Sequence, residues 1–160
     1  MSRQFHPFSL TCAEGETTLT IGIKALGDFT ETLKLIKSRV PVLVEGAFGR
    51  FSYKFYPYKK QVWIAGGIGV TPFVSLAKSL DIHKEFIIDF YYSVKNIEEA
   101  VYRDLFQNIS RDNPHFRFHL RLSKDKGRLT AEEIINEVKD LSEREIFICG
   151  PTVLMVSMKK

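Results

Sequence analysis

The sequence predicts an α/β protein in which a region of antiparallel β-structure is followed by an open parallel sheet. Residues 5–24 alternate between apolar and polar positions, which is typical of antiparallel strands. From residue 60 onward, short apolar segments alternate with segments of helical periodicity. That order produces a parallel sheet, because each helix carries the chain back across it. A glycine-rich turn at 66–72 joins the first of these strands to the first helix.

The amino-terminal part contains three predicted elements. Residues 5–24 form two strands joined by a tight Glu-Gly-Glu turn. A short helix follows over 28–38 and is ended by Pro41. Residues 42–44 form a further strand, and the aromatic stretch after it shows no helical periodicity. We therefore expect a domain boundary near Pro57.

Four apolar segments predict the strands of the parallel sheet, and three segments of helical periodicity predict the helices. The third strand alternates apolar and basic residues, so it is predicted to lie at a sheet edge with one face buried. The second strand is apolar except for Asp89 and predicts an interior position. The strands are expected at 61–65, 86–92, 115–122 and 145–149, and the helices at 72–80, 98–110 and 130–140.

The turn at 66–72 reads GGIGVTP and is a candidate phosphate-binding element. Glycines allow positive backbone angles and close approach of a ligand. Thr71 at the cap and Pro72 at the first helical position leave backbone amides pointing outward, and such a helix start attracts phosphate. A tight turn without a ligand gives the same pattern, and the glycines alone leave that alternative open.

The same region favours NADPH over NADH. Pro72 stands where the dinucleotide fingerprint has its third glycine, and the second strand ends in Tyr92 and Ser93 without an acidic residue. An acidic residue at that point would bind the ribose of NAD. Its absence leaves Ser93, Lys95 and Arg128 as candidates to contact a 2'-phosphate.

The composition argues against several other classes of protein. The chain is 44% hydrophobic and 26% charged, and it has no apolar run near the roughly 20 residues of a membrane-spanning helix and no secretory leader, which predicts a cytoplasmic location. Its 23 basic residues are scattered among 19 acidic ones, so no nucleic-acid face is expected. Neither the two cysteines nor the histidines have metal-ligand spacing, and no hydrolase triad stands out.

Five segments in a fixed order carry a family resemblance. They are HPFSL at 6–10, GDFT at 27–30, GAFG at 46–49, the turn at 66–72, and CGP at 149–151. Together they resemble the ferredoxin reductase superfamily, most of all the cytosolic FAD- and NAD(P)-binding region of ferric reductases and NADPH oxidases. The resemblance implies part of an antiparallel FAD-binding β-barrel over 1–57. It also implies a carboxyl-terminally truncated NAD(P)-binding domain over 58–160, with strand order 3-2-1-4 and the fifth strand missing.

The resemblance implies that the HPFSL segment holds FAD. It places His6 near the pyrophosphate, Phe8 against the ring and Ser9 near flavin N5, while Gly46 and Gly49 help to bind the FAD diphosphate. Taken alone, His6 would be read as an exposed strand histidine and Phe8 as a core aromatic residue. The predicted FAD-binding residues are His6, Pro7, Phe8, Ser9, Gly46 and Gly49.

The resemblance also assigns the nucleotide residues. It implies that Thr71 contacts the diphosphate, that the loop after the third strand recognises a 2'-phosphate, and that Cys149 lies beside the nicotinamide, where it and Ser9 shape the contact with flavin. Taken alone, Cys149 would be read as a small buried side chain. For the loop after the third strand, the alternative is that its polar residues are simply solvated and bind no ligand. The predicted nucleotide-binding residues are Gly66, Gly67, Gly69, Thr71, Pro72, Ser93, Lys95, Ser123, Lys124, Arg128, Cys149, Gly150 and Pro151.

The function that the resemblance implies is a flavin-dependent NAD(P)H oxidoreductase of the ferric reductase kind. A hydride would pass from NADPH, or alternatively NADH, to FAD, and single electrons would continue to haem, an iron–sulfur protein or ferric iron. Membrane attachment is expected only through amino-terminal helices outside these residues. Because much of the barrel that encloses flavin lies outside the sequence, we expect weak FAD retention and no activity from these residues alone.

Two other functions stay open on the sequence. One is a non-catalytic nucleotide-binding or electron-transfer module that docks a partner subunit. The other is an interaction domain whose basic face, formed by Arg117, Arg121 and Lys124, holds acidic partners.

Overall fold

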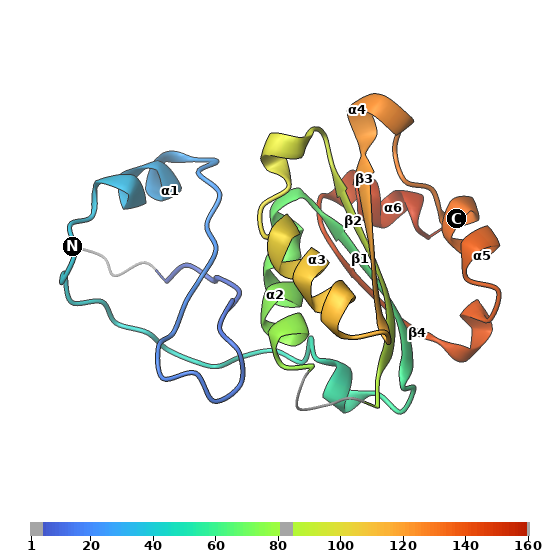
Figure 1. The fold of residues 1–160 in the computed structure, drawn as a ribbon. Coiled ribbons are helices and arrows are strands. Elements are labelled where there is room, and N and C mark those ends of the chain that lie inside the picture. The colour runs from blue at the N-terminus through green and yellow to red at the C-terminus, as the bar shows by residue number, and fades with distance from the viewer. Residues whose placement is uncertain (1–4, 81–84, 160) are drawn as a thin grey trace.

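Four parallel strands form the sheet predicted from residue 60 onward. The computed structural model describes residues 5–80 and 85–159 and arranges the strands in the order β3-β2-β1-β4 (Figure 1). The predicted α/β fold, the parallel pairing and the strand order are confirmed. The bounds are Lys60–Gly66 for β1, Ile87–Val94 for β2, Phe116–Leu122 for β3 and Glu145–Cys149 for β4.

Helices cover both faces of this sheet. Helices α2 (Thr71–Lys78) and α3 (Arg103–Asp112) cover one face, and α5 (Ala131–Glu137) and α6 (Thr152–Ser157) cover the other (Figure 1). A four-residue helix, α4, spans Ser123–Lys126 directly after β3. Burial on both faces explains why β1 and β2 are almost continuously apolar.

The core on the α2 and α3 face is built from aromatic side chains. Trp63, Phe73, Phe90, Phe106 and Phe116 are all at most 1% exposed. The ring of Phe90 lies 5.2 Å from that of Phe73 and 4.8 Å from that of Phe106. Such offset and edge-on pairs add to the stabilisation from buried area. This layer holds β1, β2 and the two helices as one unit.

The helix predicted over 98–110 is interrupted. A 3-10 turn covers Ile97–Glu99, and Tyr102 then adopts a left-handed conformation with φ of 64° before α3 begins. Asn96 accounts for the first break, because its side-chain oxygen accepts a hydrogen bond from the Glu99 amide and caps a turn separate from the helix. The helices predicted over 72–80 and 130–140 are present, each two to three residues shorter at its carboxyl end.

β3 lies at the edge of the sheet as predicted, but its basic face is not free. Arg117 donates two hydrogen bonds to the Asp89 carboxylate, and Arg121 pairs with Glu133 of α5. His119 stacks on Tyr91 with ring centroids 4.4 Å apart. The alternative in which Arg117, Arg121 and Lys124 hold acidic partners is therefore less favoured, since carboxylates of this chain already pair with the two arginines.

The amino-terminal part has less regular structure than predicted. The hairpin of residues 5–24 contains one antiparallel bridge, Leu10 to Ile21, and no strand is assigned elsewhere in residues 5–58. Residues 42–44 are 62–73% exposed, and they lack the backbone ladder that makes an extended segment a strand. The predicted helix 28–38 is present as α1 (Asp28–Thr32) followed by a 3-10 turn over Leu33–Leu35.

The helix after Gly27 ends early for a local reason. Ile36 takes extended backbone angles, so the helix stops several residues before Pro41. At its start, the Thr30 hydroxyl accepts hydrogen bonds from the amides of Leu26 and Gly27 and so caps the first turn. Among residues 5–80 and 85–159, no helix is long and apolar enough to cross a membrane.

Candidate nucleotide-binding site

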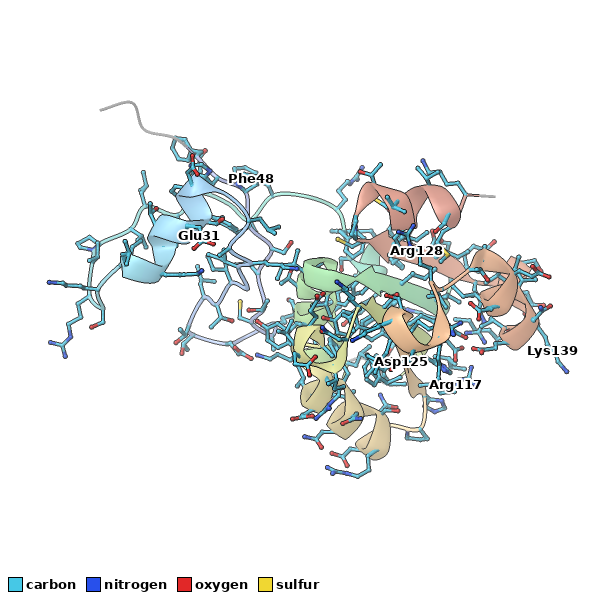
Figure 2. All side chains as sticks on the ribbon, turned by 90° about the horizontal axis from the view of Figure 1, so that it is seen from above. Glu31, Phe48, Arg117, Asp125, Arg128 and Lys139 are labelled. Carbon is cyan, nitrogen blue, oxygen red and sulfur yellow. The ribbon has the colours of Figure 1, made fainter. Side chains whose placement is uncertain are left out.

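The carboxyl ends of the four strands bring most of the predicted nucleotide residues to one edge of the sheet. In the register, Ala65 lies opposite Cys149, and Gly66 lies opposite Ser93. β2 and β3 end side by side, so the loops that follow them also meet at this edge. Figure 2 looks down on this edge and labels Asp125 of α4 and Arg128, which follows that helix. In open α/β sheets this edge is where ligands bind.

Three of the predicted glycines hold the turns after β1 and β4 together. A Cβ atom on Gly69 would lie 2.6 Å from the carbonyl carbon of Cys149 and 2.7 Å from Gly150 Cα. One on Gly66 would lie 2.7 Å from Leu154 Cδ2. These glycines are therefore required for packing. This supports the alternative that the glycines serve a tight turn, whether or not a ligand binds there. They also place the CGP segment directly against the glycine turn.

Gly67 differs from the other glycines of the turn. Its φ is +52°, and an added Cβ would meet nothing within 4 Å. The backbone at this point therefore borders open space at the sheet edge. A residue with a positive φ and no neighbour leaves room for a ligand to approach the main chain closely.

Thr71 is the first residue of α2 and not its cap. A 3-10 turn over Gly67–Val70 precedes the helix, so the predicted cap is displaced by one residue and Pro72 becomes the second helical position. The Thr71 hydroxyl donates to the carbonyl of Ile68 at 3.1 Å, and the residue is 5% exposed. In the ligand-free chain the hydroxyl proton is therefore directed at this carbonyl, and the oxygen keeps lone pairs.

The loops after β2 and β3 form a cationic cluster. The amide of Lys124 donates to the carbonyl of Lys95 at 3.0 Å, which joins the two loops. Ser93 and Ser123 are half-buried, whereas Lys95, Lys124 and Arg128 are exposed. None of these three cations forms an ion pair with any residue that the structure describes. The predicted 2'-phosphate residues therefore do lie at one edge, with their charges available.

Cys149 lies at the end of β4 and is half-buried. Burial raises the pKa of its thiol, because the buried surroundings disfavour the thiolate. The side chain is therefore uncharged near neutral pH.

We expect Cys149 to react more slowly with iodoacetamide than free cysteine at pH 7.5, since only the thiolate attacks. The rate should fall by about tenfold for each unit by which the pKa is raised. Peptide mass spectrometry over time would report the rate at this residue, and the same protein in urea is the control. Labelling of Cys149 in the folded chain as fast as in urea would contradict the expectation.

The predicted FAD residues lie in the amino-terminal part, which Figure 1 shows beside α2 and away from the sheet. The rings of His6 and Phe29 stack with centroids 3.5 Å apart, and Phe8 lies 6.5 Å from the same ring. Pro7, Ser9, Gly46 and Gly49 are exposed. The structure thus groups His6 and Phe8 around one aromatic ring of α1.

The amino-terminal part docks along the whole of α2. The Glu14 amide donates to Ser79 Oγ at 3.1 Å, and Lys78 pairs with Glu16 at 3.4 Å. At the other end of the helix, a Cβ on Gly22 would lie 2.7 Å from Thr71 Cγ2. The predicted hairpin therefore contacts the helix that begins at the glycine turn.

Two sets of side-chain pairings were not predicted from the sequence. Buried Asp89 is bound by Arg117 and by Arg144, whose Nη1 atom lies 2.8 Å from the carboxylate. Arg121 and Glu133 form the second set, next to the cationic loop. The one charge in an apolar strand, Asp89, was a visible signal for the first set. No local pattern pairs Arg121 with Glu133.

The strand order, the glycine turn after β1 and the cationic loops after β2 and β3 define an open-sheet, nucleotide-binding α/β domain. The family model described as the oxidoreductase NAD-binding domain matches residues 63–160, more than half of the chain. The chain belongs to this family of oxidoreductases.

The relatives include a reductase subunit and an NADPH oxidase. The glycine betaine monooxygenase reductase subunit of Chromohalobacter salexigens is 28% identical over 130 residues, which are 74% of this chain and 35% of the relative. NADPH oxidase 1 of Rattus norvegicus is 42% identical over 82 residues, which are 48% of this chain and 15% of the relative. The chain thus spans about a third or less of these relatives.

A ferredoxin-NADP+ reductase from Plasmodium falciparum with 2'P-AMP shares the fold. Its TM-score is 0.72 at 19% identity, and the match covers 95% of this chain and 68% of that one. The match extends over the amino-terminal part as well as the sheet. The resemblance to the ferredoxin reductase superfamily is confirmed by the family match and by this shared fold.

Proposed function

We propose that this chain supplies the NADPH-binding domain, residues 58–160, and part of the FAD-binding domain, residues 1–57, of a flavin-dependent NAD(P)H reductase. Residues 1–4 of the FAD-binding part lie outside the residues that the structure describes. FAD and NADPH would supply the redox chemistry, with a hydride passing between them and single electrons leaving for haem, an iron–sulfur protein or ferric iron. The proposed location is the cytoplasmic side.

The observation that carries this proposal is the set of exposed cations next to an open glycine turn. Lys95, Lys124 and Arg128 lie after β2 and β3, at the same edge as Gly67. Phosphate oxygens are bound by such cations and by backbone amides. We assign the nucleotide diphosphate to the turn around Gly67 and the 2'-phosphate to the cationic loops. The 2'P-AMP in the related reductase structure supports the choice of NADPH.

The amino-terminal part has features that fit a flavin. The Nε2 atom of His6 is buried and has no hydrogen-bond partner among residues 5–80 and 85–159. Such an atom is costly unless a ligand or water binds it. Phe8 is 36% exposed and Ser9 is exposed, so both are accessible to a planar ring. We assign the FAD pyrophosphate to His6, Gly46 and Gly49, and the ring to Phe8 and Ser9.

The role of the protein is then to bind the two cofactors, to orient them, and to keep charged side chains away from the place where they meet. The glycine turn holds the diphosphate at the sheet edge, and the packing of Gly69 on Gly150 fixes the CGP segment relative to it. Cys149 presents an uncharged thiol at this edge. In this arrangement Cys149 and Ser9 border the nicotinamide and the flavin, and no acid–base residue is needed.

The proposal is tested by titrating the purified chain with NADPH and with NADH by calorimetry. We expect NADPH to bind about tenfold more tightly or better, because each charge-assisted contact to the 2'-phosphate adds to its affinity alone. The double variant Lys124→Ala, Arg128→Ala should lose this preference and keep its NADH affinity. Lys139→Ala, an exposed cation after α5, is the matched control.

A parallel titration with FAD tests the second assignment. Weak FAD binding that weakens further in His6→Ala would support it. If neither nucleotide binds, the chain is better explained as a docking module that holds a partner subunit and performs no redox cycle.

A further inference from the structure

Arg121 binds the loop that follows β3, residues 123–130, and its side chain is mostly shielded from solvent. It lies one residue before the end of β3, and its side chain is 15% exposed. Its Nη1 atom donates to the carbonyl of Lys126 at 3.2 Å, and its Nη2 atom pairs with the carboxylate of Glu133. Both terminal nitrogens of the guanidinium are therefore committed to this chain.

Glu133 connects Arg121 to the far end of the same loop. Its Oε2 atom accepts hydrogen bonds from the amide of Thr130 at 3.0 Å and from the Thr130 hydroxyl at 3.2 Å. The Glu133 amide donates to the same hydroxyl at 3.2 Å, which completes the cap of α5. The hydrogen bond from Arg121, followed by that from Thr130, lowers the pKa of Glu133. The carboxylate is thus ionised at neutral pH.

The loop 123–130 is consequently fixed at three points. The Lys124 amide bonds to the carbonyl of Lys95 at one end, Arg121 holds the carbonyl of Lys126 in the middle, and Glu133 holds Thr130 at the other end. Between these points Gly127 has a φ of +71°, which lets the chain reverse. Lys124, Lys126 and Arg128 are exposed and form no ion pair within the described residues.

We propose that Arg121 and Glu133 form a clamp that holds the loop 123–130 in the shape that binds the 2'-phosphate, so that Arg121 is a positioning residue for NADPH specificity. This proposal rests on the proposed function. Long cationic side chains on a mobile loop lose much of their binding energy to ordering, and a loop that is already ordered avoids that loss. The clamp acts mainly on the NADPH affinity, because NADH carries an uncharged hydroxyl where NADPH carries the 2'-phosphate.

The variant Glu133→Gln separates the clamp from simple electrostatics. It removes a negative charge close to the loop, so charge alone would make NADPH bind more tightly. The clamp makes the opposite prediction, because Arg121 and Thr130 bind different oxygens of the carboxylate and Gln places an NH2 group at one of these two positions. We expect the NADPH affinity to fall about tenfold and the NADH affinity to stay unchanged.

Two arginine variants complete the calorimetric experiment. Arg121→Lys keeps the charge but cannot reach both Lys126 and Glu133 with a planar fork, so it should behave like Glu133→Gln. Arg117→Lys is the matched control. Arg117 lies on the same strand and face as Arg121 and also pairs with a carboxylate, that of Asp89. It is four residues from Arg121, and its hydrogen bonds go to Asp89 and not to the loop. It should keep the NADPH preference.

Amide hydrogen exchange provides a second readout. Exchange in residues 123–130 should increase in Glu133→Gln and Arg121→Lys and not in Arg117→Lys. If Glu133→Gln does not fold, Arg121→Lys carries the same test. The clamp alone is overturned if the clamp variants bind NADPH as tightly as the wild type or more tightly. It is also overturned if their affinities for NADPH and for NADH fall equally. A wild-type chain that binds neither nucleotide overturns the proposed function and the clamp with it.

Discussion

We expect Asp89→Ala to lower the free energy of unfolding by about 3–5 kcal/mol, the usual cost of removing one partner from a buried ion pair. Asp89 is 3% exposed, and its carboxylate accepts from Arg117 at 2.6 and 2.5 Å and from Arg144 at 2.8 Å. The Arg144 side chain is only 6% exposed, so the variant leaves a buried cation with one carboxylate partner, Asp140, in place of two.

Urea unfolding measures this difference. The matched control is Asp112→Ala, because Asp112 also pairs with an arginine but is exposed and adjacent to it in sequence. No measurable change is expected there, since exposed pairs contribute little. Equal stability of Asp89→Ala and the wild type would show that Asp140 alone can compensate Arg144.

The pH dependence gives a sharper test of the same cluster. Burial alone raises the pKa of Asp89, but hydrogen bonds from His119 and Arg117 and the charges of Arg117 and Arg144 outweigh it, so the pKa lies below its ordinary value. A lowered pKa stabilises the folded state above the ordinary carboxyl range, and this stabilisation is lost as the pH falls through the folded pKa. The wild type should therefore lose its advantage over Asp89→Ala below about pH 4.

The parts of the fold that the sequence predicted well are those where periodicity and burial agree. β1 and β2 are apolar on both faces because helices cover both, and β3 alternates because it lies at the edge. The interruption at Tyr102 was not predictable in the same way. Its left-handed backbone interrupts a segment whose apolar spacing continues across the break.

Pairings between distant residues were beyond what the sequence could show. The turn at 66–72 was found from its glycines, but the contact of Gly69 with Gly150 joins positions on different strands. Likewise, Arg121 reads as one more basic residue of an alternating strand until Glu133 is seen beside it. The weak strand content of residues 5–58 has a similar origin, because a strand forms only where a second segment offers it a ladder.

We expect Gly69→Ala to disrupt the candidate site more than any other single change in the glycine turn. The new Cβ would contact the carbonyl of Cys149 and lie 2.7 Å from Gly150 Cα, and these are backbone atoms that cannot rotate away. Forcing extra atoms into such packing costs about 1–3 kcal/mol in stability. The turns after β1 and β4 must separate, so the affinity for both NADPH and NADH should fall by about tenfold or more.

Gly67→Ala distinguishes this steric effect from a general intolerance of the turn to substitution. Gly67 has a φ of +52° and open space around it, so an alanine there meets only the strain of a left-handed backbone, about 1–2 kcal/mol. Calorimetric titration and thermal unfolding of both variants would separate the cases. A larger loss of affinity in Gly67→Ala than in Gly69→Ala would mean that close approach of the ligand to the main chain, and not the contact between the two turns, limits binding. That outcome would agree with the diphosphate position proposed for the turn around Gly67, because bulk added in open space obstructs a molecule bound there.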